Sequence, residues 1–151
     1  MGKVLVAARV ENVGDLLAAD QGRLAPAEVR AVEVTNALVD TGATGLSMPR
    51  SLLETLGLKY LRTRKAISSA GPMEVRVFGT ARLTVQGRDC PVDVTELPDG
   101  CPVLIGQIPL EAMDFVVDMP MRRLVGSQRK RAARPRDADL SSDELSDERL
   151  G

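Results

Sequence analysis

The stretch ALVDTGATGLSMP, residues 37–49, decides how this chain is interpreted. An apolar run leads directly into Asp40, Thr41 and Gly42, so a carboxylate stands at the end of a predicted strand. Burying an ionised carboxylate is unfavourable unless it is paired or used. Gly42 permits a tight turn that brings its own N–H to the carboxylate. The stretch therefore predicts a loop that holds Asp40 for chemistry.

The chemistry available to such a loop depends on a second carboxylate nearby. Two aspartates about 3 Å apart cannot both be ionised, so they share one proton. One then acts as a base on water and the other as an acid toward a carbonyl oxygen, and a peptide bond is hydrolysed without a metal. Thr41 offers a hydroxyl that can hydrogen-bond to a second copy of the loop. The simpler alternative is that Asp40 only caps a turn.

Composition limits the other possibilities. The chain has 151 residues, of which 44% are hydrophobic and 2% aromatic, so one domain with an aliphatic core is expected. It contains no histidine, which excludes Ser-His-Asp and Cys-His catalysis and most zinc sites. No Gly-rich phosphate loop is present, so we expect neither a metal nor a cofactor.

Charge and cysteine content indicate which partners and which cellular compartment to expect. The net charge is −1, so no overall field draws the chain to nucleic acid or to a membrane. No run is long enough to span a bilayer, and the start does not read as a signal peptide. Cys90 and Cys101 are predicted to be reduced thiols, and we expect a cytoplasmic protein.

The hydrophobic pattern predicts short strands and two short helices, an all-β domain of barrel type. A turn is expected at residues 11–15 and a loop at 16–26, and Asn36 is expected to break a strand. The expected strands are 4–10, 28–35, 37–39, the two arms of a hairpin within 65–85, 87–97, 98–106, and one or two strands within 115–126. The expected helices are 49–56, which has Pro49 near its start and Gly57 after its end, and 108–114.

The composition changes after Gly126. Residues 127–151 hold a basic cluster and then an acidic one, with few apolar residues, and this predicts a disordered tail after a folded domain of residues 1–126. The basic cluster has no interleaved aromatic residues on which bases could stack, so nucleic-acid binding is not expected.

Four segments in order resemble the retropepsin-like (clan AA) single-lobe aspartic proteases, bacterial type. They are ALVDTGA at 37–43, the glycine-containing hairpin ISSAGPMEVRVFG at 67–79, PVLIG at 102–106, and the helix IPLEAMD at 108–114. The resemblance covers roughly residues 4–124. It implies a closed β-barrel of the acid-protease type that is active as a two-fold homodimer, since one Asp-Thr-Gly copy supplies one carboxylate.

The resemblance also implies a function and a set of site residues. It implies an aspartic endopeptidase that hydrolyses an extended polypeptide under two flap hairpins, with a homodimer partner and no metal, cofactor, membrane or nucleic-acid partner. The implied catalytic residues are Asp40, Thr41 and Gly42. The implied substrate-binding residues are Ala43, Thr44, Ser69, Ala70, Gly71, Pro72 and Ile105.

One departure and one alternative remain. Retroviral members place an acidic residue after the Asp-Thr-Gly-Ala segment and an arginine after the later glycine, whereas this chain has Thr44 and Gln107 there, so a weaker dimer is expected. The alternative function is a non-catalytic peptide-binding or dimerisation module that keeps the fold. The hairpin at 68–77 could likewise be a plain surface hairpin. An intact Asp-Thr-Gly favours the enzyme.

Overall fold

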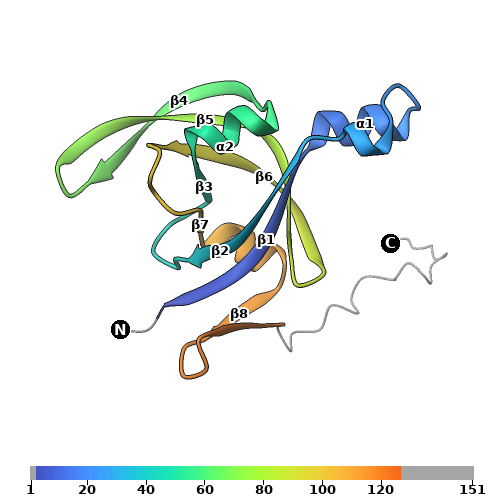
Figure 1. Cartoon of the computed structure of the whole chain (residues 1–151). Coiled ribbons are helices and arrows are strands. Elements are labelled where there is room, and N and C mark those ends of the chain that lie inside the picture. Colours follow the sequence, from blue (N-terminus) through green and yellow to red (C-terminus); the bar gives the residue numbers. More distant parts are fainter. Residues whose placement is uncertain (1–2, 127–151) are drawn as a thin grey trace, which may run out of the picture.

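Strands dominate the structure, a computed structural model that describes residues 3–126 (Figure 1). The strands are β1 Val4–Asn12, β2 Ala31–Val39, β3 Leu46–Pro49, β4 Lys59–Ser68, β5 Gly71–Val85, β6 Arg88–Leu97, β7 Leu104–Ile105, β8 Phe115–Asp118 and β9 Arg123–Gly126. The helices are α1 Val13–Asp20, α2 Arg50–Leu56 and α3 Gln107–Ala112, with a 3₁₀ turn at Pro26–Glu28. The predicted tail at 127–151 lies outside the described residues.

The main sheet closes on itself. Its strand order is β1-β2-β7-β3-β6-β5-β4, and β1 also pairs with β5. The first six strands in this order therefore form a ring, and β4 is left at a free edge. The pairs β2–β7 and β3–β6 are parallel, and the other pairs are antiparallel. A separate hairpin of β8 and β9 follows the ring.

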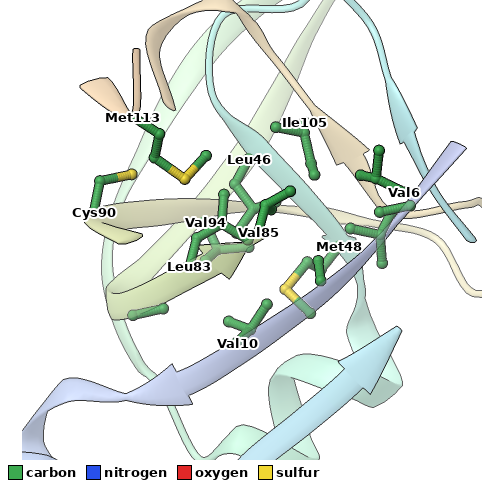
Figure 2. Close-up of a cluster of buried hydrophobic side chains, with 14 of the residues drawn as sticks. Val6, Val10, Leu46, Met48, Leu83, Val85, Cys90, Val94, Ile105 and Met113 are labelled. Atoms are coloured by element: carbon green, nitrogen blue, oxygen red, sulfur yellow. The ribbon is translucent and has the colours of Figure 1, made fainter. Parts of the chain in front are cut away.

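The interior of the ring is aliphatic, as the low aromatic content predicted (Figure 2). Alternate residues of β1 point inward, and Val4, Val6, Ala8 and Val10 are all buried. Fully burying an aliphatic side chain of this size contributes about 1.5–3 kcal/mol, so the alternation fixes which face of the strand turns inward.

The two cysteines are free thiols, as predicted. Cys90 lies on β6 in the core, where burial and then the nearby negative charge of Asp89 raise the pKa of the thiol. It therefore acts as a small apolar side chain.

The predicted turn at residues 11–15 and the first part of the predicted loop, residues 16–20, were wrong, because β1 continues to Asn12 and helix α1 follows it; residues 21–25 do form a loop. Asn12 caps this helix: its side chain accepts a hydrogen bond from the Asp15 N–H at 3.0 Å and donates one to the Leu56 carbonyl at 2.8 Å. Asp15 in the first turn also suits the helix dipole. The helix buries none of its residues, so it lacks the apolar stripe by which a helix is recognised in a sequence.

Asn36 does not end a strand, contrary to expectation. β2 continues to Val39, and the disturbance is absorbed as a bulge: Val6 pairs with Ala37 but Ala8 pairs with Val34, so β2 has one residue more than β1. A separate difference concerns β7, which spans Leu104–Ile105 and is shorter than the strand predicted at 98–106.

Two further strands depart from the sequence predictions: β3 at Leu46–Pro49 was not predicted, and β4 begins at Lys59, before the predicted hairpin arm, because most of its residues are exposed and show no apolar alternation. Helix α2, the two turns and the last segment agree with the sequence. Gly57 ends α2 with a φ of 64°, in the left-handed region that favours glycine. The hairpin of β4 and β5 forms as expected, and Gln86 and Gly87 make the next turn with φ values of 51° and 80°. The predicted last segment is a pair of strands, β8 and β9.

Candidate active site

Asp40 follows β2 immediately and is fixed by its backbone. Its N–H donates to the Ile105 carbonyl at 2.9 Å, and the Leu38 N–H donates to the Val103 carbonyl at 2.8 Å. These bonds continue the parallel pairing of β2 with β7 past the end of the strand. The carboxylate is therefore carried on the edge of the packed core rather than on a free loop.

The turn after Asp40 directs the carboxylate. The Gly42 N–H donates to Asp40 Oδ1 at 3.0 Å, and the Ala43 N–H donates to the Asp40 carbonyl at 3.0 Å. A Cβ on Gly42 would lie 3.3 Å from that same carboxylate oxygen, which leaves little room for a side chain. The sequence predicted this approach of the Gly42 N–H, and the geometry shows it.

The Asp40 side chain is only half-buried, and Thr41 is exposed. Within residues 3–126, the Gly42 N–H is the single hydrogen-bond partner of the carboxylate, and the Thr41 hydroxyl has none. One carboxylate oxygen and one hydroxyl are thus available to water, a substrate or another chain.

The loop after Asp40 is joined to the start of α3. Three N–H groups donate to three loop carbonyls, each at 2.9 Å: Gly106 to Gly45, Gln107 to Ala43, and Ile108 to Thr44. Gly106 lies so close that a Cβ on it would be 2.6 Å from the Ala43 carbonyl oxygen and 2.7 Å from that of Gly45. Segments far apart in the sequence therefore form one rigid support under the carboxylate.

Ile105 was expected to contact substrate, and the structure gives it a different position. Its side chain is fully buried in the core (Figure 2). It contributes to the site through its backbone carbonyl, which holds the Asp40 N–H.

Thr44 and Gln107 do not replace the missing ion pair with a bond between their side chains. The Gln107 side chain donates to Glu111 Oε2 at 2.9 Å, one turn along α3. Thr44 is exposed and is held through its backbone carbonyl.

The remaining predicted site residues form the tip of the β4–β5 hairpin. Ser69 and Ala70 make the turn, and Gly71 and Pro72 begin β5, with Gly71 at a φ of 112°. The hairpin projects beyond the ring (Figure 1). In the described part of the chain, no hydrogen bond joins this tip to the Asp40 loop.

A pocket of about 330 Å³ lies beside Asp40. Its lining residues come from three segments of the chain: Lys3, Val4, Leu38, Val39, Asp40, Thr41, Val117 and Met119. Sequence reasoning missed Lys3, Val117 and Met119, because only the tertiary packing brings the two ends of the described chain to the loop. The hairpin of β8 and β9 also leaves Val116 and Met121 exposed close to Met119 in sequence.

No cluster of three or more acidic, cysteine or histidine side chains able to hold a metal ion occurs within residues 3–126. Over the same residues, no helix is long and apolar enough to cross a membrane.

Glu96 anchors the base of the β4–β5 hairpin. Arg76 on β5 donates to both of its carboxylate oxygens, at 2.9 and 2.7 Å, and Arg50 on α2 donates at 3.1 Å. The Glu96 side chain is 9% exposed. The hydrogen bond from Arg76 lowers the pKa of Glu96 below its ordinary value, against the opposing effect of burial.

This anchor predicts a loss of stability in acid. Because the pKa of Glu96 is lower in the folded state than its ordinary 4.5, its ion pairs stabilise the fold above pH 4.5 and are lost as the pH falls through the lowered value. We expect Glu96→Gln to melt at a lower temperature than the unmodified protein at pH 7, and this difference to shrink below pH 4.5.

The matched control for Glu96 is Glu33→Gln, because Glu33 pairs with Arg9 at the surface, where a salt bridge contributes about 0–1 kcal/mol. Thermal unfolding followed by circular dichroism from pH 7 to pH 3 gives the comparison. A Glu96→Gln difference that stays constant over this range would contradict the proposed anchor.

A strand ring that presents Asp-Thr-Gly at a strand end, joined there to a second apolar strand ending in glycine, defines the class of the aspartic proteases. The sequence model of a family described as "Aspartyl protease", part of the retropepsin-like clan, matches residues 25–108. This is more than half of the chain, and the chain belongs to that family. The match includes the Asp40 loop, the β4–β5 hairpin and β7. A search of curated proteins found no match.

Proposed function

We propose that the protein is an aspartic endopeptidase that works as a homodimer. The observation that carries the proposal is the setting of Asp40: the Gly42 N–H holds one carboxylate oxygen, and the other is open beside a pocket. Family membership supports peptide hydrolysis in general. The endopeptidase specificity and the dimer are our additions.

In the proposed mechanism, the Asp40 carboxylates of two protomers meet across a two-fold axis and share one proton. The ionised carboxylate takes a proton from a water molecule, and the oxygen of that water attacks the peptide carbonyl carbon. The protonated carboxylate gives its proton to the carbonyl oxygen. When the tetrahedral intermediate collapses, the C–N bond breaks and the carboxyl that took the proton from water gives it to the leaving amine. The other carboxylate takes a proton from a hydroxyl of the intermediate, so the pair again holds one proton. The Thr41 hydroxyl is proposed to bond to the partner's loop.

The substrate is proposed to be an extended polypeptide. Such a chain can add as a strand between the Asp40 loop and the β4–β5 hairpin, with backbone hydrogen bonds holding it in place. Ala43 and Thr44 would contact the peptide on the side of the Asp40 loop, and the tip from Ser69 to Pro72 would close over its opposite side. The curved ring of one protomer is then the single-lobe barrel of the family, which provides half of a cleft.

Two further features support the proposed dimer and a cytoplasmic location. The pocket beside Asp40 and the exposed apolar residues of the β8–β9 hairpin lie at the same end of the fold, where a second chain could cover them. The free thiols of Cys90 and Cys101 favour a reducing compartment, which supports a cytoplasmic location.

The dimer requirement predicts how activity depends on concentration. Since one chain supplies one Asp40, activity per chain should fall on dilution through the dimer dissociation constant, which we expect near micromolar because Thr44 and Gln107 form no ion pair. A peptide-library digest read by mass spectrometry first identifies a cleaved peptide. A dilution series then measures its hydrolysis per chain, with sedimentation on the same samples.

Constant activity per chain in samples that sediment as monomers would refute the dimer mechanism. Absence of any cleavage in dimeric samples from acid to neutral pH would refute the endopeptidase.

A further inference from the structure

The β4 strand leaves one side of its backbone unpaired. Among the strands of residues 3–126 it pairs with β5 alone, so its other side presents N–H and C=O groups without strand partners in that part of the chain. The strand is 10 residues long and mostly exposed. Figure 1 shows it on the hairpin that projects from the ring. An edge of this length can accept an extended segment as an added strand.

The β4 edge is strongly basic and carries no carboxylate. Its cationic residues are Lys59, Arg62, Arg64 and Lys65. Among the described residues, Lys59 and Lys65 make no ion pair. Arg64 bonds a neutral hydroxyl, that of Thr95, at 3.2 Å. The one ion pair is between Arg62 and Asp93, at 3.6 Å.

By contrast, arginines on other segments pair with carboxylates. Arg82 donates twice to the buried Glu11, Arg76 donates twice to Glu96, and Arg30 pairs with Asp15 at 2.8 Å. The β4 edge therefore carries four cations, of which Arg62 pairs with Asp93 and Lys65 lies across from Glu74 on β5. Cations on an edge strand discourage pairing with a second copy of the same edge. They attract an extended segment of opposite charge.

The chain itself contains such a segment. Residues 137–148 hold six carboxylates and no cation. The carboxylate residues are Asp137, Asp139, Asp143, Glu144, Asp147 and Glu148. We propose that residues 137–148 bind along the free edge of β4 in the same chain.

The connection, when extended, reaches about the width of the domain. Ten residues, 127–136, separate the end of β9 from the acidic segment. Fully extended, they span up to about 35 Å, which is about the diameter of a sphere with the radius of gyration of about 14 Å expected for a domain of this size. A tethered segment also acts at an effective concentration of about a millimolar, so a weak charge-driven contact can still be occupied.

The test is amide hydrogen exchange of the full-length protein, measured residue by residue with NMR. The comparison variant has every Asp and Glu of residues 137–148 replaced by Asn or Gln. We expect the β4 amides that point away from β5 to exchange about 10-fold more slowly in the unmodified protein than in this variant. The difference should vanish as salt is raised from about 0.05 M to about 1 M, because salt screens exposed charges.

A pair of charge variants makes the test specific. Lys59→Gln with Lys65→Gln should remove the protection of β4. Arg23→Gln with Arg122→Gln, which removes the same charge at exposed sites on other segments, should keep it. Equal exchange in the unmodified and tail-neutralised proteins would overturn the proposal. A difference in protection between the unmodified and tail-neutralised proteins that grows with protein concentration would also overturn it, since the segment would then come from another molecule. None of these readouts requires peptide hydrolysis.

Discussion

Replacing Asp40 by asparagine is expected to abolish peptide hydrolysis while the fold and the dimer persist. Asparagine has almost the same shape, and its side-chain oxygen can still accept the Gly42 N–H. It cannot remove a proton from water or hold the shared proton, so both proton transfers of the proposed mechanism fail. Loss of acid–base catalysis alone predicts a fall in kcat/KM of about 10³-fold or more.

The control for this variant is Asp20→Asn, which removes one exposed carboxylate at the end of α1. It should retain full activity. Circular dichroism and sedimentation on all three proteins would separate a chemical effect from unfolding or dissociation.

Hydrolysis that survives Asp40→Asn would show that another group is the catalyst. If the unmodified protein dimerises and binds peptides without cleaving them, and Asp40→Asn changes neither property, the non-catalytic module is the better description.

The parts of the fold that the sequence predicted are those set by local chemistry. Pro49 and Gly57 bracket α2, because one suits a helix start and the other adopts the left-handed conformation that ends it. Alternating apolar residues located most strands, and Gln86 with Gly87 marked a turn. The close approach of the Gly42 N–H to Asp40 was also predictable, since the two groups are only two residues apart.

The parts that were missed depend on distant contacts. α1 forms although it buries no residue, and the cap that starts it, Asn12, is itself tied to the Leu56 carbonyl. The closure of the ring by β1 and β5 was expected from the family resemblance, whereas the strand pattern alone does not show which strands pair to close it. The pocket residues Lys3 and Met119 lie at opposite ends of the described chain. Burial of Ile105 follows from the same long-range packing.

Gly106→Ala is expected to be the most destabilising single-methyl change at the site. The backbone of Gly106 has φ −92° and ψ −171°, which alanine adopts freely, so the conflict is steric rather than conformational. The added Cβ would meet the Ala43 carbonyl oxygen at 2.6 Å and carbon at 2.7 Å. These are backbone atoms, which cannot move aside by a side-chain rotation.

Relief of that clash requires the Asp40 loop and the start of α3 to separate. Separation lengthens the hydrogen bonds that the Gly106 and Gln107 N–H groups donate to the loop, both at 2.9 Å. Overpacking of this kind costs about 1–3 kcal/mol, and weakened buried hydrogen bonds add to it, so we expect about 3 kcal/mol less stability. Because the same contact positions the loop that carries Asp40, hydrolysis should fall at temperatures where the variant is still folded.

Gly45→Ala provides a matched control within the same loop. A Cβ on Gly45 would meet no atom within 4 Å, and its φ lies outside the left-handed region, so alanine should be tolerated. Urea unfolding of the three proteins gives the free energies of unfolding, and assays at a fixed dimer fraction give the activities. If Gly45→Ala and Gly106→Ala were equally stable and equally active, the contact between the Asp40 loop and Gly106 would not be what positions the carboxylate.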